Sequence, residues 1–227
     1  MPSERLVSFA EFEQYLSNLR MPREIEEVIV HHTEEPTAAQ YRGVATIQGV
    51  RRYHMEVRGW SDNGYHIMIG PNADIWLCRP LERSGGHTLG HNAHSVGLSH
   101  VANFDTEDPR GYGGMVTGQR VVAAVLKRFG LGVEVVHFHR EFADKTCPGM
   151  KLDLTTYRKG VEQVSYKDVQ IVVEPGGKVI ACRGRVEGDV TRVDLRSLAE
   201  ALGMQVEDRI RGEGKVVLEA RGGKGEG

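Results

Sequence analysis

Residues 133–149 constrain the fold of this chain more than any other segment. A β-branched apolar run at 133–136 predicts a buried strand that continues to His139. Cys147 follows on a loop that also carries a Pro-Gly pair. A strand that ends in histidine and leads into a cysteine-bearing loop brings nitrogen and sulfur donors to one edge of a sheet. Zinc accepts both kinds of donor, so this edge is a candidate metal site.

A second apolar run, at residues 28–30 within a strand predicted at 25–30, leads into His31 and His32. If the two strands lie side by side in one sheet, their histidines converge on the same edge and supply a further ligand. Two alternatives stay open on this pattern. His137 would share a strand face with His139 and competes with it as a ligand. The cluster would also suit a closed structural zinc site.

Length and composition limit the remaining possibilities. The 227 residues suit one full-sized domain, predicted at 1–164, and a small accessory domain at 165–220, followed by a disordered tail at 221–227. The formal net charge is -2 and no long basic block occurs, which argues against a nucleic-acid partner. Three cysteines at no framework spacing argue against a disulfide scaffold and favour a reducing cytosol.

The N-terminal segment is polar and has no secretory apolar core. No apolar run reaches the roughly 18 residues of a membrane span. We therefore expect synthesis in the cytoplasm without a signal peptide and no membrane-spanning helix, so that a target outside the cell membrane requires some other route of release.

Periodicity predicts helices alternating with strands along the larger domain. A capping box at Ser8 and Glu11 opens a helix, and Thr117 opens another that ends at Gly130. Further helices are predicted at 44–57 and 154–164, and strands at 65–69, 75–78 and 95–100. The fold class is therefore α/β (α+β), with a central mixed sheet flanked by helices and the zinc site at strand ends. His54, at helical spacing, is predicted to be a buried core histidine.

The smaller domain has a different pattern of apolar and turn residues. Runs at 169–173 and 178–182, separated by a Pro-Gly-Gly turn, predict a β-hairpin. A short helix at 194–202 and a closing strand at 216–218 follow.

Four motifs, taken together and in this order, resemble one family: Val30–Thr33, Gly59–Gly70, Gly86–Asn92 with Ser95–Leu98, and His139 with Cys147–Gly149. The family is the N-acetylmuramoyl-L-alanine amidase type 2 family, the zinc amidases of peptidoglycan. It includes amidase-type phage lysozymes and the peptidoglycan-recognition proteins. The resemblance spans about residues 24 to 160.

The resemblance implies a role for each matching residue. The zinc ligands would be His31, His139 and Cys147, which leaves a fourth tetrahedral position open for water. Tyr65 matches the tyrosine beside the metal, and Lys145 matches the basic catalytic residue of the phage enzymes. Other branches of the family hold a different residue at the lysine position. Substrate binding falls to His87, His32 and Asn92.

The implied activity is zinc-dependent hydrolysis of the amide bond between N-acetylmuramic acid and L-alanine, with peptidoglycan or a muropeptide as the partner. A phage or prophage endolysin, released through a holin-type membrane lesion, fits the expected lack of an export signal. A cytoplasmic muropeptide-recycling amidase would lack that signal too. A recognition module that binds without cleaving is a further alternative, although such relatives typically lose the cysteine ligand. A peptidase using the same metal also stays open.

The smaller domain is similar, around Val193–Gly203, to the small N-terminal stalk domain of copper amine oxidases. It has no cluster of metal ligands, so the resemblance does not imply copper chemistry. Two roles are expected for it, a cell-wall anchor or a homodimerisation unit.

Overall fold

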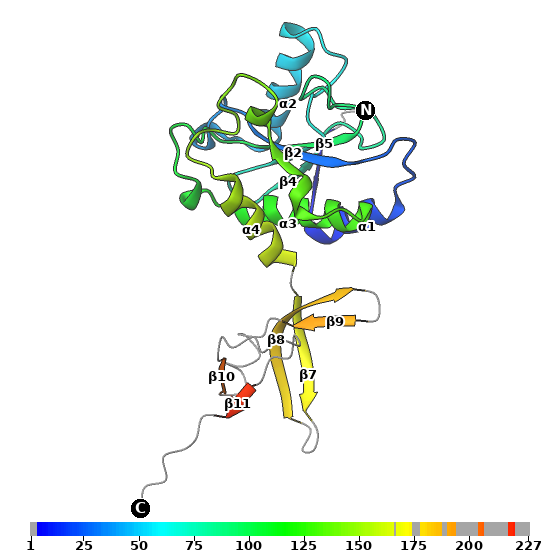
Figure 1. Cartoon of the computed structure of the whole chain (residues 1–227). Helices are drawn as coiled ribbons and strands as arrows, with labels where there is room; N and C mark the ends of the chain where they lie inside the picture. Colours follow the sequence, from blue (N-terminus) through cyan, green and yellow to red (C-terminus); the bar gives the residue numbers. More distant parts are fainter. Residues whose placement is uncertain are drawn as a thin grey trace, which may run out of the picture. The chain divides into compact units, whose positions relative to one another are not determined.

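The computed structural model describes residues 4–165, 167–173, 178–187, 190–193, 204–206 and 218–220 (Figure 1). The chain divides into two compact units, Met1–Val164 and Ser165–Gly227. None of the helices in the described ranges is long and apolar enough to cross a membrane.

The first unit is built on a six-stranded sheet with the order β1-β4-β3-β5-β2-β6. Strands β3, β5, β2 and β6 run parallel to one another, whereas β4 pairs antiparallel with β3, and β1 antiparallel with β4. This is the predicted mixed sheet. Its strands are β1 Arg5–Val7, β2 Glu27–His32, β3 Ile67–Ile69, β4 Ile75–Leu77, β5 Ser95–His100 and β6 Val136–Phe138.

Helices cover both faces of this sheet (Figure 1). On one face lie α1 (Phe9–Asn18), α3 (Met115–Phe129) and α4 (Leu154–Ser165), and they share the larger apolar core with Val28 and Val30 of β2. On the other face lies α2 (Val44–Arg52), continued by a π-helical turn at Tyr53–Val57. Its Ile47 packs with Met68 and Trp76 in a smaller core. Alternate residues of each strand therefore face two different environments.

The start of α1 and the end of α3 are as predicted, whereas α3 begins at Met115 after Gly114 and without a side-chain cap, two residues before the predicted Thr117. The Ser8 hydroxyl accepts the Glu11 N–H at 3.2 Å and the Glu11 carboxylate accepts the Ser8 N–H at 2.7 Å, which completes the capping box of α1. Gly130 ends α3 in a left-handed conformation with φ 68°, where a side chain would add strain.

The strand predicted at 133–139 is shorter in the structure. Val133–Val135 form a 3-10 turn, β6 covers Val136–Phe138, and a second 3-10 turn begins at His139. Because β6 is the edge strand, its outer carbonyls need other partners, and the Arg158 guanidinium donates to the carbonyls of Glu134 and Val136. The valines at 133–136 predicted a strand, but they did not indicate where it begins and ends or that Arg158 would bind its carbonyls.

The second unit contains two small sheets. Strands β7 (Lys167–Val173), β8 (Lys178–Glu187) and β9 (Val190–Val193) pair antiparallel, so the predicted hairpin is present. Strands β10 (Met204–Val206) and β11 (Leu218–Ala220) pair antiparallel as well. The helix predicted at 194–202, most of the strand predicted at 216–218 and the tail at 221–227 lie outside the described residues.

Two fully buried histidines make the first unit sensitive to acid. His100 packs between α3 and α4, where Gly118 leaves room for its ring and its Nε2 lies 3.1 Å from the Tyr157 hydroxyl. Burial lowers the pKa of His66 and of His100 from 6.5 to about 3. In the unfolded chain these two imidazoles bind protons below about pH 6.5, whereas in the folded chain they bind them only near pH 3.

We expect the free energy of unfolding of the metal-free protein to fall as the pH drops below 6.5, by up to about 1.4 kcal/mol per pH unit for each such histidine. Urea titrations at pH 7, 6 and 5 measure this, with fluorescence from Trp60 and Trp76 reporting on the first unit. His100→Gln should flatten the pH dependence, whatever its stability at pH 7. An unchanged slope in that variant would contradict the assignment.

Candidate functional site

Three side chains from distant parts of the sequence meet at one edge of the sheet. His31 lies near the carboxyl end of β2, His139 follows the end of β6, and Cys147 lies on the loop beyond. Because β2 and β6 are parallel neighbours, their carboxyl ends share an edge. One donor atom from each of the three residues lies within 4.8 Å of the other two. His31 Nδ1 is 3.6 Å from the Cys147 sulfur, and the His31 and His139 rings are 4.6 Å apart.

Strand alternation separates His31 from His32. His31 faces the α2 side of the sheet, where it meets Cys147, whereas His32 faces the larger core. The His32 ring is 4% exposed, accepts the Phe104 N–H at Nδ1 at 3.1 Å and stacks on the Phe104 ring. In this geometry His32 supports the loop after β5, and it offers no exposed surface for the substrate binding expected of it.

The point at which β6 ends determines which of His137 and His139 lies near His31 and Cys147. His137 pairs with Ile29 in the sheet, and its Nδ1 lies 3.0 Å from the Glu141 carboxylate. His139 already belongs to the following 3-10 turn, so the two histidines do not share a strand face. Only His139 joins His31 and Cys147.

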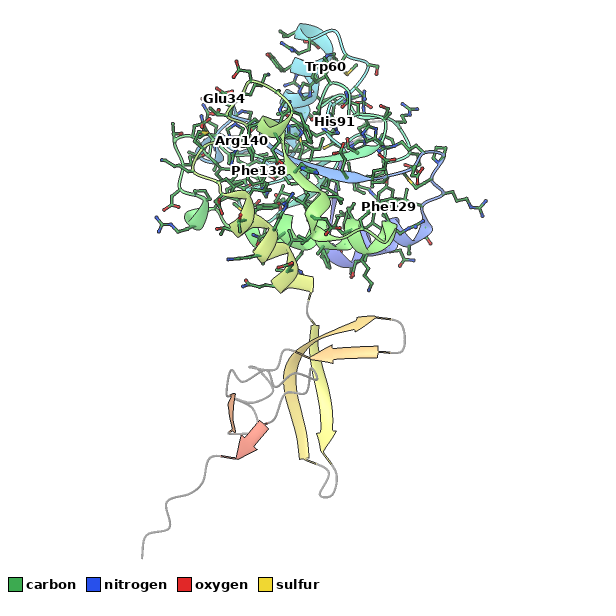
Figure 2. The ribbon with its side chains drawn as sticks, viewed as in Figure 1. Glu34, Trp60, His91, Phe129, Phe138 and Arg140 are labelled. Carbon is green, nitrogen blue, oxygen red and sulfur yellow. The ribbon has the colours of Figure 1, made fainter. Side chains whose placement is uncertain are left out.

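Arg140 fixes the loop that carries the cysteine. Its backbone N–H donates to the Cys147 carbonyl at 2.8 Å, and its guanidinium donates to the carbonyls of Gly149 and Leu152. The guanidinium also lies over the Phe138 ring, 4.7 Å from its centroid (Figure 2). Gly149 has φ 108°, and a side chain there would clash with the backbone at Phe104. The cysteine is therefore held by several contacts on a loop of irregular structure.

The donor set fits zinc. In a tetrahedral site with Zn–N of about 2.0 Å and Zn–S of about 2.3 Å, a nitrogen and a sulfur ligand lie roughly 3.6 Å apart. The separation of His31 Nδ1 and Cys147 Sγ is 3.6 Å. Two imidazoles and one thiolate are also the donor types that zinc prefers over the oxygen ligands of calcium or magnesium.

The protonation states favour metal binding by the histidines. Burial lowers the pKa of His31 well below 6.5 and that of His139 to about 4, so both rings are neutral at neutral pH and keep a free lone pair. Burial raises the pKa of the Cys147 thiol to about 12 in the metal-free protein, while the nearby charge of Lys145 lowers it. Metal binding must therefore displace a proton from the thiol.

A chain of hydrogen bonds behind His31 sets its orientation. With Nδ1 of His31 facing the metal position, its Nε2–H donates to His87 Nδ1 at 3.1 Å. The His87 Nε2–H then points to the Ser95 hydroxyl at 3.3 Å, and that hydroxyl donates to the His91 carbonyl at 2.7 Å. Every donor in this chain meets an acceptor, which fixes the tautomers of both rings.

His87 therefore lies behind a metal ligand and not in an open groove. It is 7% exposed, and a side chain at Gly85 or Gly97 would clash with its ring. Asn92, also expected to bind substrate, accepts the N–H groups of His87 and Thr88 at 2.7 and 2.9 Å and so closes the turn that carries them. In this arrangement both residues position His31.

We expect His87→Ala to weaken zinc binding by about 10- to 100-fold, because His31 loses the partner that orients it. Competition with a chelating dye measures the affinity. His87→Asn places an amide near the position of Nδ1 and should recover part of the loss. Equal affinities in the wild type and His87→Ala would show that the contact does not position the ligand.

Tyr65 and Lys145, the two residues expected to be catalytic, lie near the cluster. The Tyr65 ring is 5.2 Å from that of His31, and burial raises its pKa, so the hydroxyl stays protonated. Tyr65 precedes β3 and its N–H is bound by the Asn63 side chain, so it packs on the α2 side together with Met68. The Lys145 side chain is exposed, and its charge lowers the pKa of His139 and Cys147.

A cleft of about 780 Å³ opens next to Tyr65. Its walls are the loop after β2 at residues 33–36, helix α2 and the π-helical turn, with Tyr53 and His54 among its lining. His54 is 6% exposed and its Nδ1 accepts the Gly64 N–H at 3.2 Å, which confirms the predicted buried histidine. The cleft could not be predicted from the sequence, because its walls come from three separate segments.

A family model described as N-acetylmuramoyl-L-alanine amidase matches residues 21–150, which is more than half of the chain. The chain belongs to this amidase family. The matched range contains all three residues of the metal-ligand cluster and Tyr65 and Lys145 as well.

Relatives of this amidase-family chain include recognition proteins and an amidase. Peptidoglycan-recognition protein SC1a of Drosophila melanogaster is 31% identical over 128 residues, which cover 53% of this chain and 66% of that protein. The human N-acetylmuramoyl-L-alanine amidase is 30% identical over 125 residues, covering 53% of this chain and 22% of that protein. The match thus spans just under two thirds of the first relative and less than a quarter of the second.

Solved structures share the fold of the amidase domain. Drosophila PGRP-LB aligns with a TM-score of 0.51 and 25% identity, over 65% of this chain and 89% of that structure. The Ph2119 endolysin from a Thermus scotoductus bacteriophage aligns with a TM-score of 0.53 and 21% identity, over 63% and 88%. The second likeness concerns the fold alone.

Proposed function

We propose that this protein is a zinc-dependent amidase that hydrolyses the bond between N-acetylmuramic acid and L-alanine in peptidoglycan. The observation that carries the proposal is the convergence of His31, His139 and Cys147, with donor atoms within 4.8 Å of one another. Family membership supports the same reaction class.

Zinc held by these three residues would supply a Lewis acid that polarises the amide carbonyl and makes water acidic enough to attack near neutral pH. Tyr65 keeps its proton and donates a hydrogen bond to the charge that develops on the carbonyl oxygen. Lys145 adds a positive charge to the same region without being buried. His87 keeps the His31 ring in place. The cleft beside Tyr65 is large enough to hold part of a glycan or stem peptide.

The intact ligand set favours hydrolysis over recognition alone. The family contains proteins named for recognition as well as amidases, and the two groups share one fold. A binding module has no need of three converging metal donors, whereas a zinc hydrolase with this donor set needs the thiolate together with both imidazoles. Cys147 therefore weighs against a purely recognising protein.

The biological setting that we propose is a phage or prophage endolysin that reaches the wall after release from the cytoplasm. Endolysins are among the proteins with this fold. For the second unit we propose an accessory role, either wall binding, as its likeness to the stalk domain suggests, or homodimerisation. Sedimentation of the full chain with and without purified wall separates these two roles.

An end-group assay on purified cell wall tests the activity. The amidase should release new free amino termini of L-alanine, and both a chelator and Cys147→Ser should abolish the release. New amino termini on other residues would indicate a peptidase. Binding to the wall without new termini would indicate a recognition module, and reducing sugar ends without amino groups would indicate a glycosidase; each of these results contradicts the proposal.

A further inference from the structure

A second cluster of metal-ligand residues lies at the opposite end of β2. Glu27 is the first residue of that strand and is 8% exposed. Its Oε1 lies 2.7 Å from His91 Nδ1 and 3.3 Å from His94 Nε2. One donor atom from each of the three residues lies within 4.8 Å of the others, and none of the three belongs to the cluster around Cys147.

Two imidazoles lie against the Glu27 carboxylate. Within the described ranges, the ion-pair partners of this buried carboxylate are the two imidazoles, without an arginine or lysine. A cation among these side chains would stabilise the arrangement, because burying a carboxylate is costly without compensation. A divalent metal ion between the three side chains would supply that charge.

The backbone holds the ligands in place before any ion binds. The Glu26 N–H donates to the His94 carbonyl at 2.8 Å, which ties the start of β2 to the turn that carries the histidines. The His91 carbonyl accepts the Ser95 hydroxyl at 2.7 Å. The His91 ring packs on Phe142, with ring centroids 3.9 Å apart.

Both imidazoles remain accessible. The side chains of His91 and His94 are 28% and 35% exposed, so an ion can enter from solvent. In a tetrahedral zinc site, nitrogen and oxygen ligands lie roughly 3.3 Å apart. The separation of Glu27 and His94 already has this value, while that of Glu27 and His91 must open by about 0.6 Å, which a small rotation of the carboxylate provides.

We propose that Glu27, His91 and His94 form a second transition-metal site, selective for zinc-like ions. Two imidazoles and one carboxylate are a zinc donor set, and they contain too few oxygens for calcium or magnesium. The segment from His87 to His94 then connects the two sites. At one end His87 orients His31, and at the other His91 and His94 bind the second ion.

Metal stoichiometry tests the proposal on the full chain, purified without a histidine tag and dialysed against limiting free zinc. The wild type should bind two zinc ions, and Cys147→Ser and His94→Ala should each bind one. His137→Ala is the matched control, because His137 is another partly exposed histidine beside a glutamate, and this variant should still bind two. Glu27→Gln should lose the same ion as His94→Ala. It replaces His94→Ala in the experiment if the latter variant is unstable.

Cobalt substitution identifies which ion is lost. Only the site with Cys147 gives a thiolate-to-cobalt charge-transfer band, so His94→Ala should keep this band at full intensity while binding one ion fewer. Cys147→Ser should lose the band and keep one cobalt ion. A wild type that binds a single ion, lost in Cys147→Ser and kept in His94→Ala, would overturn the second site and leave the proposed function intact. Failure of the first site would give the reverse pattern.

Discussion

Cys147→Ser is expected to lose the zinc ion of the His31 site and, with it, all but a trace of amide hydrolysis. A serine hydroxyl does not ionise near neutral pH, so only two neutral imidazoles remain to hold the ion. Loss of a direct ligand should exceed the roughly 10- to 100-fold effect of losing a residue that merely supports a ligand. Metal analysis and the release of L-alanine amino termini, measured on the same preparation, give both readouts.

Cys78→Ser is the matched control for this substitution. Cys78 is a second thiol of the described residues, buried in the small core on the α2 side, away from the metal ligands. Its replacement should lower stability yet leave zinc content and activity near those of the wild type. Chelation of the wild type should reproduce the Cys147→Ser result, and added zinc should reverse it. Full activity in metal-free protein would remove zinc from the reaction.

The two histidines of the candidate metal site were predictable because each lies at or just beyond the end of an apolar run. The runs at 28–30 and 133–136 indicated strands, and strands with parallel neighbours bring their carboxyl ends together. Periodicity alone could not predict whether His31 or His32 joins His139 and Cys147. Residues 28–30 are apolar on both faces, because helices cover both sides of the sheet, so no alternation marks which face holds the site. The family resemblance made that choice.

The roles of the segment at 85–94 could not be predicted from the sequence. It has no periodicity, and its contacts reach far along the chain: His87 meets His31, which is 56 residues away, and His91 meets Glu27, which is 64 residues away. His87 and Asn92 were expected to bind substrate. In the structure His87 contacts His31, Asn92 accepts the His87 N–H, and His91 and His94 lie in a second cluster with Glu27.

The position of Tyr65 illustrates a similar limit. A strand over the whole predicted range 65–69 would place Tyr65 on the same face as Ile67 and Ile69. The turn through Asn63 keeps Tyr65 out of the strand, and it faces the α2 side with the metal ligands. The turn residues before β3 can be recognised in the sequence. Which side of the sheet Tyr65 faces depends, however, on where β3 begins to pair with β5, and the sequence does not show this.

Tyr65→Phe is expected to keep the metal and lower kcat by about 100-fold, the effect of removing one hydrogen-bond donor to a developing oxyanion. The phenol is not a member of the ligand cluster, so zinc content should stay at the wild-type value. Because burial raises the pKa of Tyr65, it acts as a donor throughout the neutral range, and the wild-type rate should show no ionisation that Tyr65→Phe abolishes below pH 9.

Tyr53→Phe separates this effect from the loss of a hydroxyl in the cleft. Tyr53 lines the same cleft but is 52% exposed, and its ring contacts His54 and not the His31 cluster. Its replacement should change KM and leave kcat within a few-fold of the wild type, whereas Tyr65→Phe should change kcat. Full turnover in Tyr65→Phe would show that the carbonyl oxygen receives no essential hydrogen bond from this phenol. The group near the cluster left to stabilise the developing charge would then be Lys145.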